Sequence, residues 1–291
     1  MATVSMADFR TSEKSWWCPG CGDFGVLAAL QKALVELGIE PEKVAVAAGI
    51  GCSGKIGNYI NSYNLHVVHG RSLPAAQGVK LANRELTVIA AGGDGDGFAI
   101  GMGHYMHALR RNVDITYIVM DNQIYGLTKG QTSPTSDGGF MTKSTPAGNI
   151  EKPVNQLQLA IASGCGFVAN GFSSNQKQLV EIIKKAILFP GFAIVNTYSP
   201  CVTFNKVNTY DFFKESLTNL DEDPNYDRHD RFAAMHKLME TNELVMGVVY
   251  EDLHSKRYED MVPGYKAEGI ATQQHPSVDP AVWEKLLKAY K

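Results

Sequence analysis

Two segments of the chain carry oxygen-bearing side chains where a metal-bound phosphate could be held. The first is Gly-Gly-Asp-Gly-Asp-Gly at residues 92–97, which follows an apolar, β-branched run at residues 86–91. The second is Asn122, which follows a similar run at residues 114–121. Both runs are typical of buried strands, and residues 98–110 between them have the pattern of a helix. In such a βαβ unit we expect Asp94 and Asn122 to lie at the same carboxyl edge of a parallel sheet.

The two side chains have the chemistry that magnesium requires. Magnesium prefers a near-octahedral shell of hard oxygen atoms, takes only a few of them from protein, and completes the shell with phosphate oxygens and water. The carboxylate of Asp94, the amide oxygen of Asn122 and one backbone carbonyl meet this need. The glycines let backbone N–H groups approach a phosphate, because no Cβ stands in the way. The pattern therefore predicts a magnesium-held diphosphate site.

Other interpretations of this glycine-rich segment fit less well. A Gly-Asp-Gly turn alone is commonly a simple chain reversal, but the strand context, the matching Asn122 and Tyr-Gly-Leu-Thr at residues 125–128 favour a site. The combination resembles the diphosphate-binding half of thiamine diphosphate enzymes, whose motif is Gly-Asp-Gly followed later by Asn. A dinucleotide fingerprint is a poorer match, since Ile100 stands where Gly or Ala is needed.

The five cysteines give a second chemical signal. Cys18 and Cys21 form a glycine-rich Cys-x2-Cys hairpin, which can bring two thiolates onto one metal or cluster. Cys52 and Cys201 each stand beside Gly or Pro in loop-like contexts, so all four could form one cage. Zinc and a four-iron four-sulfur cluster would both accept four thiolates, and the spacing does not choose between them. Cys165 is expected to be a buried structural thiol. Disulfides are not expected, because the count is odd and no signal peptide is evident.

Taken together, these motifs closely resemble those of the β subunits of 2-oxoacid:ferredoxin oxidoreductases, in particular the two-subunit 2-oxoglutarate type. The resemblance covers residues 12 to about 210, with the motifs in family order. It rests on Trp-Cys-Pro-Gly-Cys-Gly-Asp at residues 17–23, Gly-Ile-Gly-Cys-Ser-Gly-Lys at 49–55, His-Gly-Arg at 69–71, the glycine-rich segment at 92–97, Arg-Arg-Asn at 110–112, Asp-Asn-Gln-Ile-Tyr-Gly-Leu-Thr-Lys-Gly-Gln at 121–131 and Ser-Pro-Cys at 199–201.

This resemblance implies specific site residues. It implies a 4Fe-4S cluster bound by Cys18, Cys21, Cys52 and Cys201, and a magnesium ion bound by Asp94, Asn122 and the carbonyl of Ile124. It also implies a thiamine diphosphate site lined by Ile50, Gly51, Cys52, Ser53, His69, Gly95, Asp96, Gly126 and Leu127. Lys55 and Arg71 are the candidates for binding the distal carboxylate of 2-oxoglutarate, a group that pyruvate lacks.

The implied activity is the reversible oxidative decarboxylation of 2-oxoglutarate with coenzyme A to succinyl-CoA and CO2, with electrons passing through the cluster to ferredoxin. Pyruvate or broad 2-oxoacid specificity is the alternative. In this superfamily the glutamate that activates thiamine comes from a separate domain. Because the chain carries only the diphosphate half, we expect an α subunit to complete the active site.

Two other enzyme classes are alternatives to this activity. One is a non-oxidative thiamine diphosphate lyase. The other is a P-loop ATPase, because residues 49–55 match Gly-x4-Gly-Lys; however, Ile56 stands where Ser or Thr must hold magnesium.

The composition is that of an ordinary globular protein, with 291 residues, 44% hydrophobic and 20% charged. A net charge of -3 gives no basic surface for nucleic acid, so no nucleic-acid partner is expected. No run approaches the roughly 18 apolar residues that a membrane span needs, so we expect no membrane association and a cytoplasmic location.

The order of the predicted elements defines the fold class. Strand-like segments at residues 43–48, 65–68, 86–91, 114–120 and 192–197 alternate with helix-like segments at 25–37, 98–110, 154–162 and 175–188. This predicts an α/β fold with a doubly wound parallel sheet of the thiamine diphosphate-binding type. Residues 1–210 are expected to form that domain, and residues 211–291, with helical segments near 228–239 and 280–290, a C-terminal extension. The long loop at residues 130–150 is expected to act as a lid or an interface.

Overall fold

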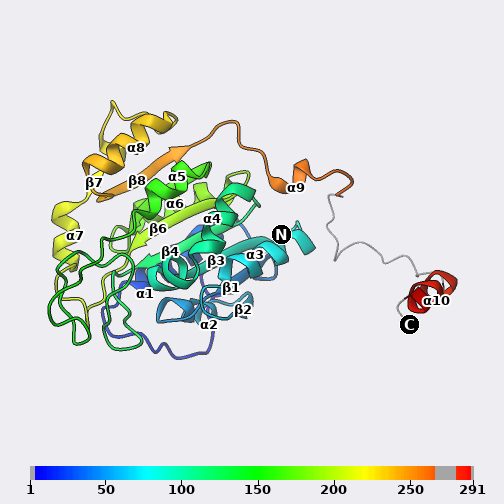
Figure 1. Ribbon diagram of the computed structural model, residues 1–291, viewed down its shortest axis with the longest axis horizontal. Coiled ribbons are helices and arrows are strands. Elements are labelled where there is room, and N and C mark those ends of the chain that lie inside the picture. Colours follow the sequence, from blue (N-terminus) through cyan, green and yellow to red (C-terminus); the bar gives the residue numbers. More distant parts are fainter. Residues whose placement is uncertain (1–3, 266–279, 290–291) are drawn as a thin grey trace.

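The computed structural model describes residues 4–265 and 280–289, and the first of these ranges is built around an eight-stranded sheet with helices on both faces (Figure 1). The strands lie in the order β2 (Tyr63–His66), β1 (Val44–Ala48), β3 (Thr87–Gly93), β4 (Thr116–Asp121), β6 (Ala193–Tyr198), β5 (Phe167–Phe172), β8 (Val245–Glu251) and β7 (Thr218–Asn219). The first six strands are parallel, whereas β8 is antiparallel to β5 and parallel to β7. The predicted α/β class with a largely parallel sheet is confirmed.

The helices divide between the two faces of this sheet. Side chains of α1 (Asp23–Glu36), α2 (Ile56–Tyr59) and α6 (Gln176–Leu188) share one apolar cluster, and those of α3 (Ser72–Ala82), α4 (Met102–Arg111), α5 (Gln156–Ala162) and α8 (Arg231–Glu240) share the other. The remaining helices are α7 (Tyr210–Ser216), α9 (Tyr258–Met261) and α10 (Pro280–Ala289). In the part of the chain that the structure describes, no helix combines the length and apolar character needed to cross a membrane.

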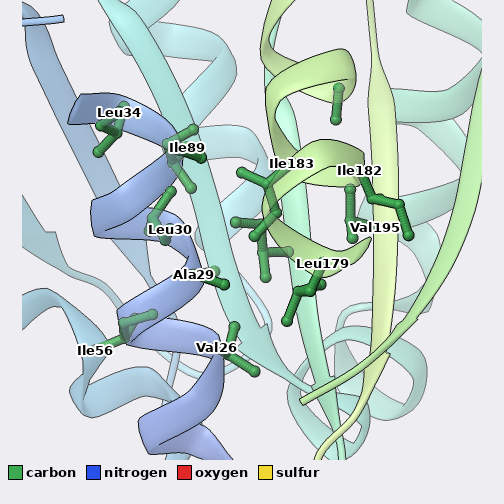
Figure 2. Close-up of a cluster of buried hydrophobic side chains, with 14 of the residues drawn as sticks. Val26, Ala29, Leu30, Leu34, Ile56, Ile89, Leu179, Ile182, Ile183 and Val195 are labelled. Carbon is green, nitrogen blue, oxygen red and sulfur yellow. The ribbon is translucent and has the colours of Figure 1, made fainter. Parts of the chain in front are cut away.

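Side chains that alternate in direction along the strands contribute to both apolar clusters. In β1, Val44 and Val46 belong to the first cluster and Ala45 to the second, because successive side chains of a strand point to opposite faces. Figure 2 shows the first cluster, in which α1 and α6 lie side by side over the sheet. The residues labelled there include Leu30, Ile89, Leu179, Ile183 and Val195. Burial of each large apolar side chain stabilises the fold by roughly 1.5–3 kcal/mol, which makes the sheet a firm base for the loops at its edge.

Several elements have no counterpart among the segments predicted from the sequence, notably α3, β5, β7 and β8. β7 and β8 come from residues beyond 210, and Val245, Val248 and Val249 of β8 are buried in the two clusters. This part of the chain therefore extends the main sheet. The second strand also begins and ends two residues before the predicted segment 65–68, at Tyr63–His66.

The strand order places a crevice at the carboxyl edge of the sheet. The chain leads from β1 to β2 on one side, and from β3 to β4 on the other side. The loops that follow β1 and β3 therefore turn away from each other. Ligands of open α/β sheets bind at such a topological switch point.

Candidate active site

A cavity opens at this switch point and brings together the residues predicted for the diphosphate. Its walls come from the loop after β1, from His69, from the glycine-rich segment after β3 and from the turn after β4. It is lined by every residue named above for magnesium and for the cofactor, namely Asp94, Asn122, Ile124, Ile50, Gly51, Cys52, Ser53, His69, Gly95, Asp96, Gly126 and Leu127. These residues come from four separate segments of the sequence, and the sheet edge collects them around one space.

Asp94 is a buried residue of the cavity lining and shares a hydroxyl with a second carboxyl group. Thr135 Oγ1 lies 2.7 Å from Asp94 Oδ2 and 2.9 Å from Asp121 Oδ1. Because a hydroxyl carries one hydrogen, it donates to only one of the two carboxyls at a time. Burial raises the pKa of Asp94 and raises that of Asp121 well above its usual range. Asp121 also accepts hydrogen bonds from Gln156 and Asn196, so it is held by neutral donors. A desolvated carboxylate such as Asp94 suits a bound cation.

A tight turn brings Asn122 and Ile124 onto the same wall. Gln123 has φ of 56°, in the left-handed region, and Ile124 N donates to Asn122 Oδ1 at 3.1 Å. Asn205 Nδ2 donates to the Asn122 carbonyl at 3.1 Å. The backbone N–H of Asn205 in turn donates to the carbonyl of Cys201 at 3.1 Å. The turn is thus connected to the segment that carries the fourth predicted cluster cysteine.

Asp96 joins the loops that follow β1 and β2. Its Oδ1 accepts hydrogen bonds from the backbone N–H of Ile50 at 2.9 Å and of Gly70 at 2.8 Å, and His69 Nδ1 lies 3.2 Å away. A Cβ on Gly49 would lie 2.0 Å from Asp96 Oδ2, so only glycine allows this close approach. One carboxylate therefore fixes the positions of two loops that line the cavity.

Gly95 is required by the aromatic ring that covers it. A Cβ at this position would lie 2.2 Å from Tyr125 Cε1, which is far below van der Waals contact. Tyr125 OH donates to the Gly95 carbonyl at 3.3 Å. The second glycine of the Gly-Asp-Gly motif thus lets the turn after β4 close over the segment after β3.

The four predicted cluster cysteines lie within electrostatic range of one another, and two of them share a neighbour at the cavity. A Cβ on Gly126 would lie 3.6 Å from the Sγ atoms of both Cys52 and Cys201. Burial raises the pKa of Cys52 to about 11, and the nearby thiols of Cys201 and Cys18 contribute to this rise. Burial also raises the pKa of Cys21, with further contributions from Cys201 and Cys52. All of these cysteines are free thiols, and Cys18 is exposed.

Asp23 lies among the cysteine-bearing segments and was not among the predicted site residues. Ser199 Oγ donates to Asp23 Oδ1 at 2.6 Å, and Ser53 and Cys21 also act as partners. Burial nevertheless raises the pKa of Asp23 to about 6. Trp17 Nε1 donates to the Cys52 carbonyl at 2.7 Å and ties the Cys-x2-Cys hairpin to the loop after β1. The available sequence signal was the Asp that directly follows Cys-Gly.

The arrangement of ligands is not that of a compact site for one ion. Within residues 4–265 and 280–289, no three His, Cys, Asp or Glu side chains lie close enough together to share a single metal ion. A zinc site made of these four cysteines would need all four sulfurs about 2.3 Å from the metal. The donor set around Cys52 and Cys201 is composed of thiols, the ligands that hold iron–sulfur clusters.

Three further residues predicted from the sequence are not among those that line the cavity. Cys165 is buried in the second apolar cluster, where its Sγ donates to the Phe167 carbonyl at 3.3 Å. Neither Lys55 nor Arg71 is among the residues that line the cavity. Lys55 ends the helical turn Ser53–Lys55, and the exposed Arg71 donates to the adjacent Gly70 carbonyl at 3.5 Å. Binding of a substrate carboxylate by these two cations therefore stays a prediction.

Comparison with known proteins assigns the class to which this fold and site belong. Residues 45–197 match the family "Thiamine pyrophosphate enzyme, C-terminal TPP binding domain". Residues 201–267 match the family that describes the C-terminal part of the pyruvate ferredoxin oxidoreductase beta chain. The sheet and its crevice are therefore those of a thiamine diphosphate-binding domain.

Individual relatives narrow the class to one family. Subunit beta of 2-oxoacid:ferredoxin oxidoreductase 1 from Aeropyrum pernix is 40% identical over 311 residues, which cover 100% of this chain and 98% of that protein. The 2-oxoglutarate synthase subunit KorB of Archaeoglobus fulgidus is 40% identical over 74% of this chain and 80% of its own length. The chain belongs to the family of 2-oxoacid:ferredoxin oxidoreductase β subunits, as the sequence motifs predicted.

A solved structure supports the same assignment. It is the 2-oxoglutarate:ferredoxin oxidoreductase from Magnetococcus marinus with 2-oxoglutarate, coenzyme A and succinyl-CoA bound. The two chains share 36% identity and superimpose with a TM-score of 0.85, over 100% of this chain and 97% of that one. The protein is thus one subunit of an oxidoreductase, and a partner subunit belongs to the enzyme.

Proposed function

We propose that this chain is the β subunit of a 2-oxoglutarate:ferredoxin oxidoreductase. The overall reaction converts 2-oxoglutarate, coenzyme A and two oxidised ferredoxins to succinyl-CoA, CO2, two reduced ferredoxins and a proton. The names of the KorB relative and of the Magnetococcus enzyme support 2-oxoglutarate as the substrate. The Aeropyrum relative carries only the name 2-oxoacid, so pyruvate or broad specificity is the competing candidate.

The observation that carries this proposal is the position of Cys52. It lines the diphosphate cavity, and its sulfur faces Gly126 together with the sulfur of Cys201. A cofactor in the cavity and a cluster held by Cys18, Cys21, Cys52 and Cys201 would therefore share one wall. Electrons leaving the substrate would need only a short path to the cluster, which distinguishes this enzyme from a non-oxidative lyase.

The residues around the cavity fit thiamine diphosphate with magnesium. Asp94, Asn122 and the carbonyl of Ile124 would hold the ion, with phosphate oxygens and water completing its shell. Gly93 and Gly95 line the cavity where the diphosphate would lie, and the absence of a Cβ on Gly95 leaves room for the Tyr125 ring beside it. Thiamine diphosphate, when bound, supplies a nucleophilic carbon and an electron sink for decarboxylation. The contribution of this chain would be to position that cofactor and its magnesium ion.

The partner subunit would complete the active site. The lining residues of the cavity include the carboxylates Asp94 and Asp96 but no glutamate. The glutamate that activates the aminopyrimidine would thus come from an α subunit, as in the wider superfamily. Ferredoxin would accept the electrons from the cluster.

An anaerobic assay of the assembled enzyme tests the proposal. The chain is co-expressed with its α subunit, and iron, acid-labile sulfide and thiamine diphosphate are quantified. CoA-dependent reduction of ferredoxin is then compared for 2-oxoglutarate, pyruvate and 2-oxobutyrate. We expect stoichiometric cofactors and preference for 2-oxoglutarate. Similar rates with the three acids would favour broad specificity, and absence of iron would reject the redox proposal.

Lys55 provides a sharper test of the substrate. A charge-assisted hydrogen bond to the distal carboxylate contributes about 1.5–3 kcal/mol, or roughly 10- to 150-fold in discrimination. Lys55→Met should therefore lower kcat/KM for 2-oxoglutarate far more than for pyruvate, whereas Lys55→Arg should keep part of the preference. An equal loss with both acids would mean that Lys55 supports the cofactor or the fold.

A further inference from the structure

The loop of residues 131–155, between β4 and α5, is attached to the magnesium site by the side chain of Thr135. Thr135 is 2% exposed, and its hydroxyl contacts the carboxyl groups of Asp94 and Asp121 at 2.7 and 2.9 Å. The hydroxyls of Ser133 and Thr135 both act to lower the pKa of Asp94 against the larger effect of burial. Both hydroxyls belong to the loop, which therefore supplies side-chain partners of this carboxylate beside the backbone of Asp94 and Gly95.

A second contact fixes the same end of the loop. Ser136 Oγ donates to the carbonyl of Gln123 at 2.6 Å, and Gln123 separates the two other predicted magnesium ligands, Asn122 and Ile124. Ser136 Oγ also accepts from the Ser133 N–H at 2.8 Å. Thr135 and Ser136 together form an anchor of the loop, because they contact the segment after β3 and the segment after β4 respectively.

Farther along the loop, backbone hydrogen bonds join residues 139–140 to residue 149. Gly139 N donates to the Asn149 carbonyl at 2.7 Å, and Asn149 N donates to the Phe140 carbonyl at 2.9 Å. Beyond this pair, the side chains of Met141 and Ile150 are 71% and 96% exposed. The loop thus has one buried end at the carboxylate and one exposed end facing away from the core.

We infer that Thr135 is a positioning residue that couples magnesium diphosphate binding to the order of the 131–155 loop. This inference rests on the proposed function, since it concerns the ion that Asp94 would hold. Thr135 orients the Asp94 carboxylate through one oxygen, and any ligand that fixes Asp94 also fixes the base of the loop. The coupling is reciprocal, because two events linked through one contact favour each other equally.

Three variants of the assembled enzyme test the inference. Thr135→Val removes the hydroxyl with little change in volume, Thr135→Ser keeps it, and Ser144→Ala is the control. Ser144 is in the same loop, and its hydroxyl contacts the side chain of Thr142 at 3.1 Å. Magnesium is titrated at a fixed, saturating concentration of thiamine diphosphate, with binding followed by circular dichroism of the cofactor. Amide hydrogen exchange in residues 131–150 is measured with and without the magnesium complex.

We expect the magnesium titration and the amide exchange of the loop to differ between Thr135→Val and the other variants. In the wild type, Thr135→Ser and Ser144→Ala, loading should slow exchange in the loop, and magnesium should saturate at similar concentrations. Thr135→Val should need about tenfold more magnesium, the size expected for one lost hydrogen bond to a charged group. Its loop should exchange at the same rate with and without the complex. Should this variant fail to assemble, Ser136→Ala removes the second anchor and should likewise abolish the exchange response.

The experiment distinguishes failure of this inference from failure of the proposed function. If Thr135→Val titrates like the wild type and its loop still responds to loading, the inference is overturned while the proposed function stands. If the wild type itself binds no thiamine diphosphate in the presence of magnesium, the proposed function fails.

Discussion

The carboxylate of Asp94 is the residue on which the magnesium assignment depends most directly. It is buried and lines the cavity, where an uncompensated charge is costly and a divalent cation would compensate it. Asp94→Asn keeps the shape but removes the charge, so the affinity for thiamine diphosphate with magnesium should fall sharply. The iron content should stay unchanged, because the cysteines are untouched. Cofactor titration of the variant checks this, and an unaltered affinity would reject Asp94 as a ligand.

Two cysteines with different surroundings test the cluster assignment. Cys201 shares Gly126 as a neighbour with Cys52, whereas Cys165 is enclosed by apolar side chains and its pKa is raised to about 12 by burial. Cys201→Ser should lose iron and sulfide and destabilise the protein. Cys165→Ala should retain both and show only the modest cost of a small cavity. Iron and sulfide analysis that ranks the two variants in the opposite order would refute the assignment.

At the scale of elements, Glu243 attaches the loop before β8 to the start of α5. Its carboxylate accepts hydrogen bonds from Leu157 N at 3.2 Å and Gln158 N at 2.9 Å, and burial raises its pKa from 4.5 to about 7. The folded protein therefore keeps a proton here that the unfolded chain releases above pH 4.5. Stability contributed by this group is complete below pH 4.5 and declines as pH rises toward 7.

The size of this effect is measurable. The raised pKa of Glu243 corresponds to a decline of about 3 kcal/mol in the free energy of unfolding between pH 4.5 and 7, because one pKa unit is equivalent to about 1.36 kcal/mol. Glu243→Gln cannot ionise, so the stability difference between variant and wild type should change across this interval. Chemical denaturation at several pH values checks it, with the exposed Glu240→Gln as control. A difference independent of pH would contradict the prediction.

The sequence predicted the elements whose side chains follow a simple pattern. Residues 86–91 and 114–120 are continuous apolar runs, and both are strands at the site. β5 escaped prediction because Asn170 and Gly171 interrupt its apolar pattern, although the Asn170 amide donates to the Glu243 and Val245 carbonyls. β8 contains Gly247, at φ of 127°, and pairs with β5 through a bulge. Such polar and irregular strands are stabilised by partners that are distant in sequence.

The same distinction applies to the site. Cysteines, glycines and the Asp–Asn pair could be recognised because their chemistry and spacing are local. Asp23 and Thr135 could not, because their roles arise from contacts with Ser199 and Asp94, far away along the chain. Lys55 was chosen because a distal carboxylate needs a cation and because its loop also carries a predicted cofactor contact; it is not among the residues that line the cavity, and its role stays a prediction.

At the scale of the whole molecule, the proposed function gives the chain half of a catalytic centre. The cavity offers ligands for magnesium and a glycine-lined wall, but the base that activates thiamine is absent from its lining residues. The isolated chain should therefore bind thiamine diphosphate with magnesium and consume no 2-oxoacid. Adding the separately purified α subunit under anaerobic conditions should restore CoA-dependent turnover. Substantial decarboxylation by the isolated chain would show that the catalytic base lies within it.

The hydrogen bonds of Asp96 have a thermodynamic consequence for cofactor loading. Because one carboxylate fixes the Ile50 and Gly70 amides together, these parts of the cavity are assembled before any ligand arrives. A preorganised surface loses little conformational entropy when it binds. Calorimetry of loading should then report a heat-capacity change that reflects the cofactor's own apolar area and the response of the 131–155 loop, rather than folding of the rest of the site.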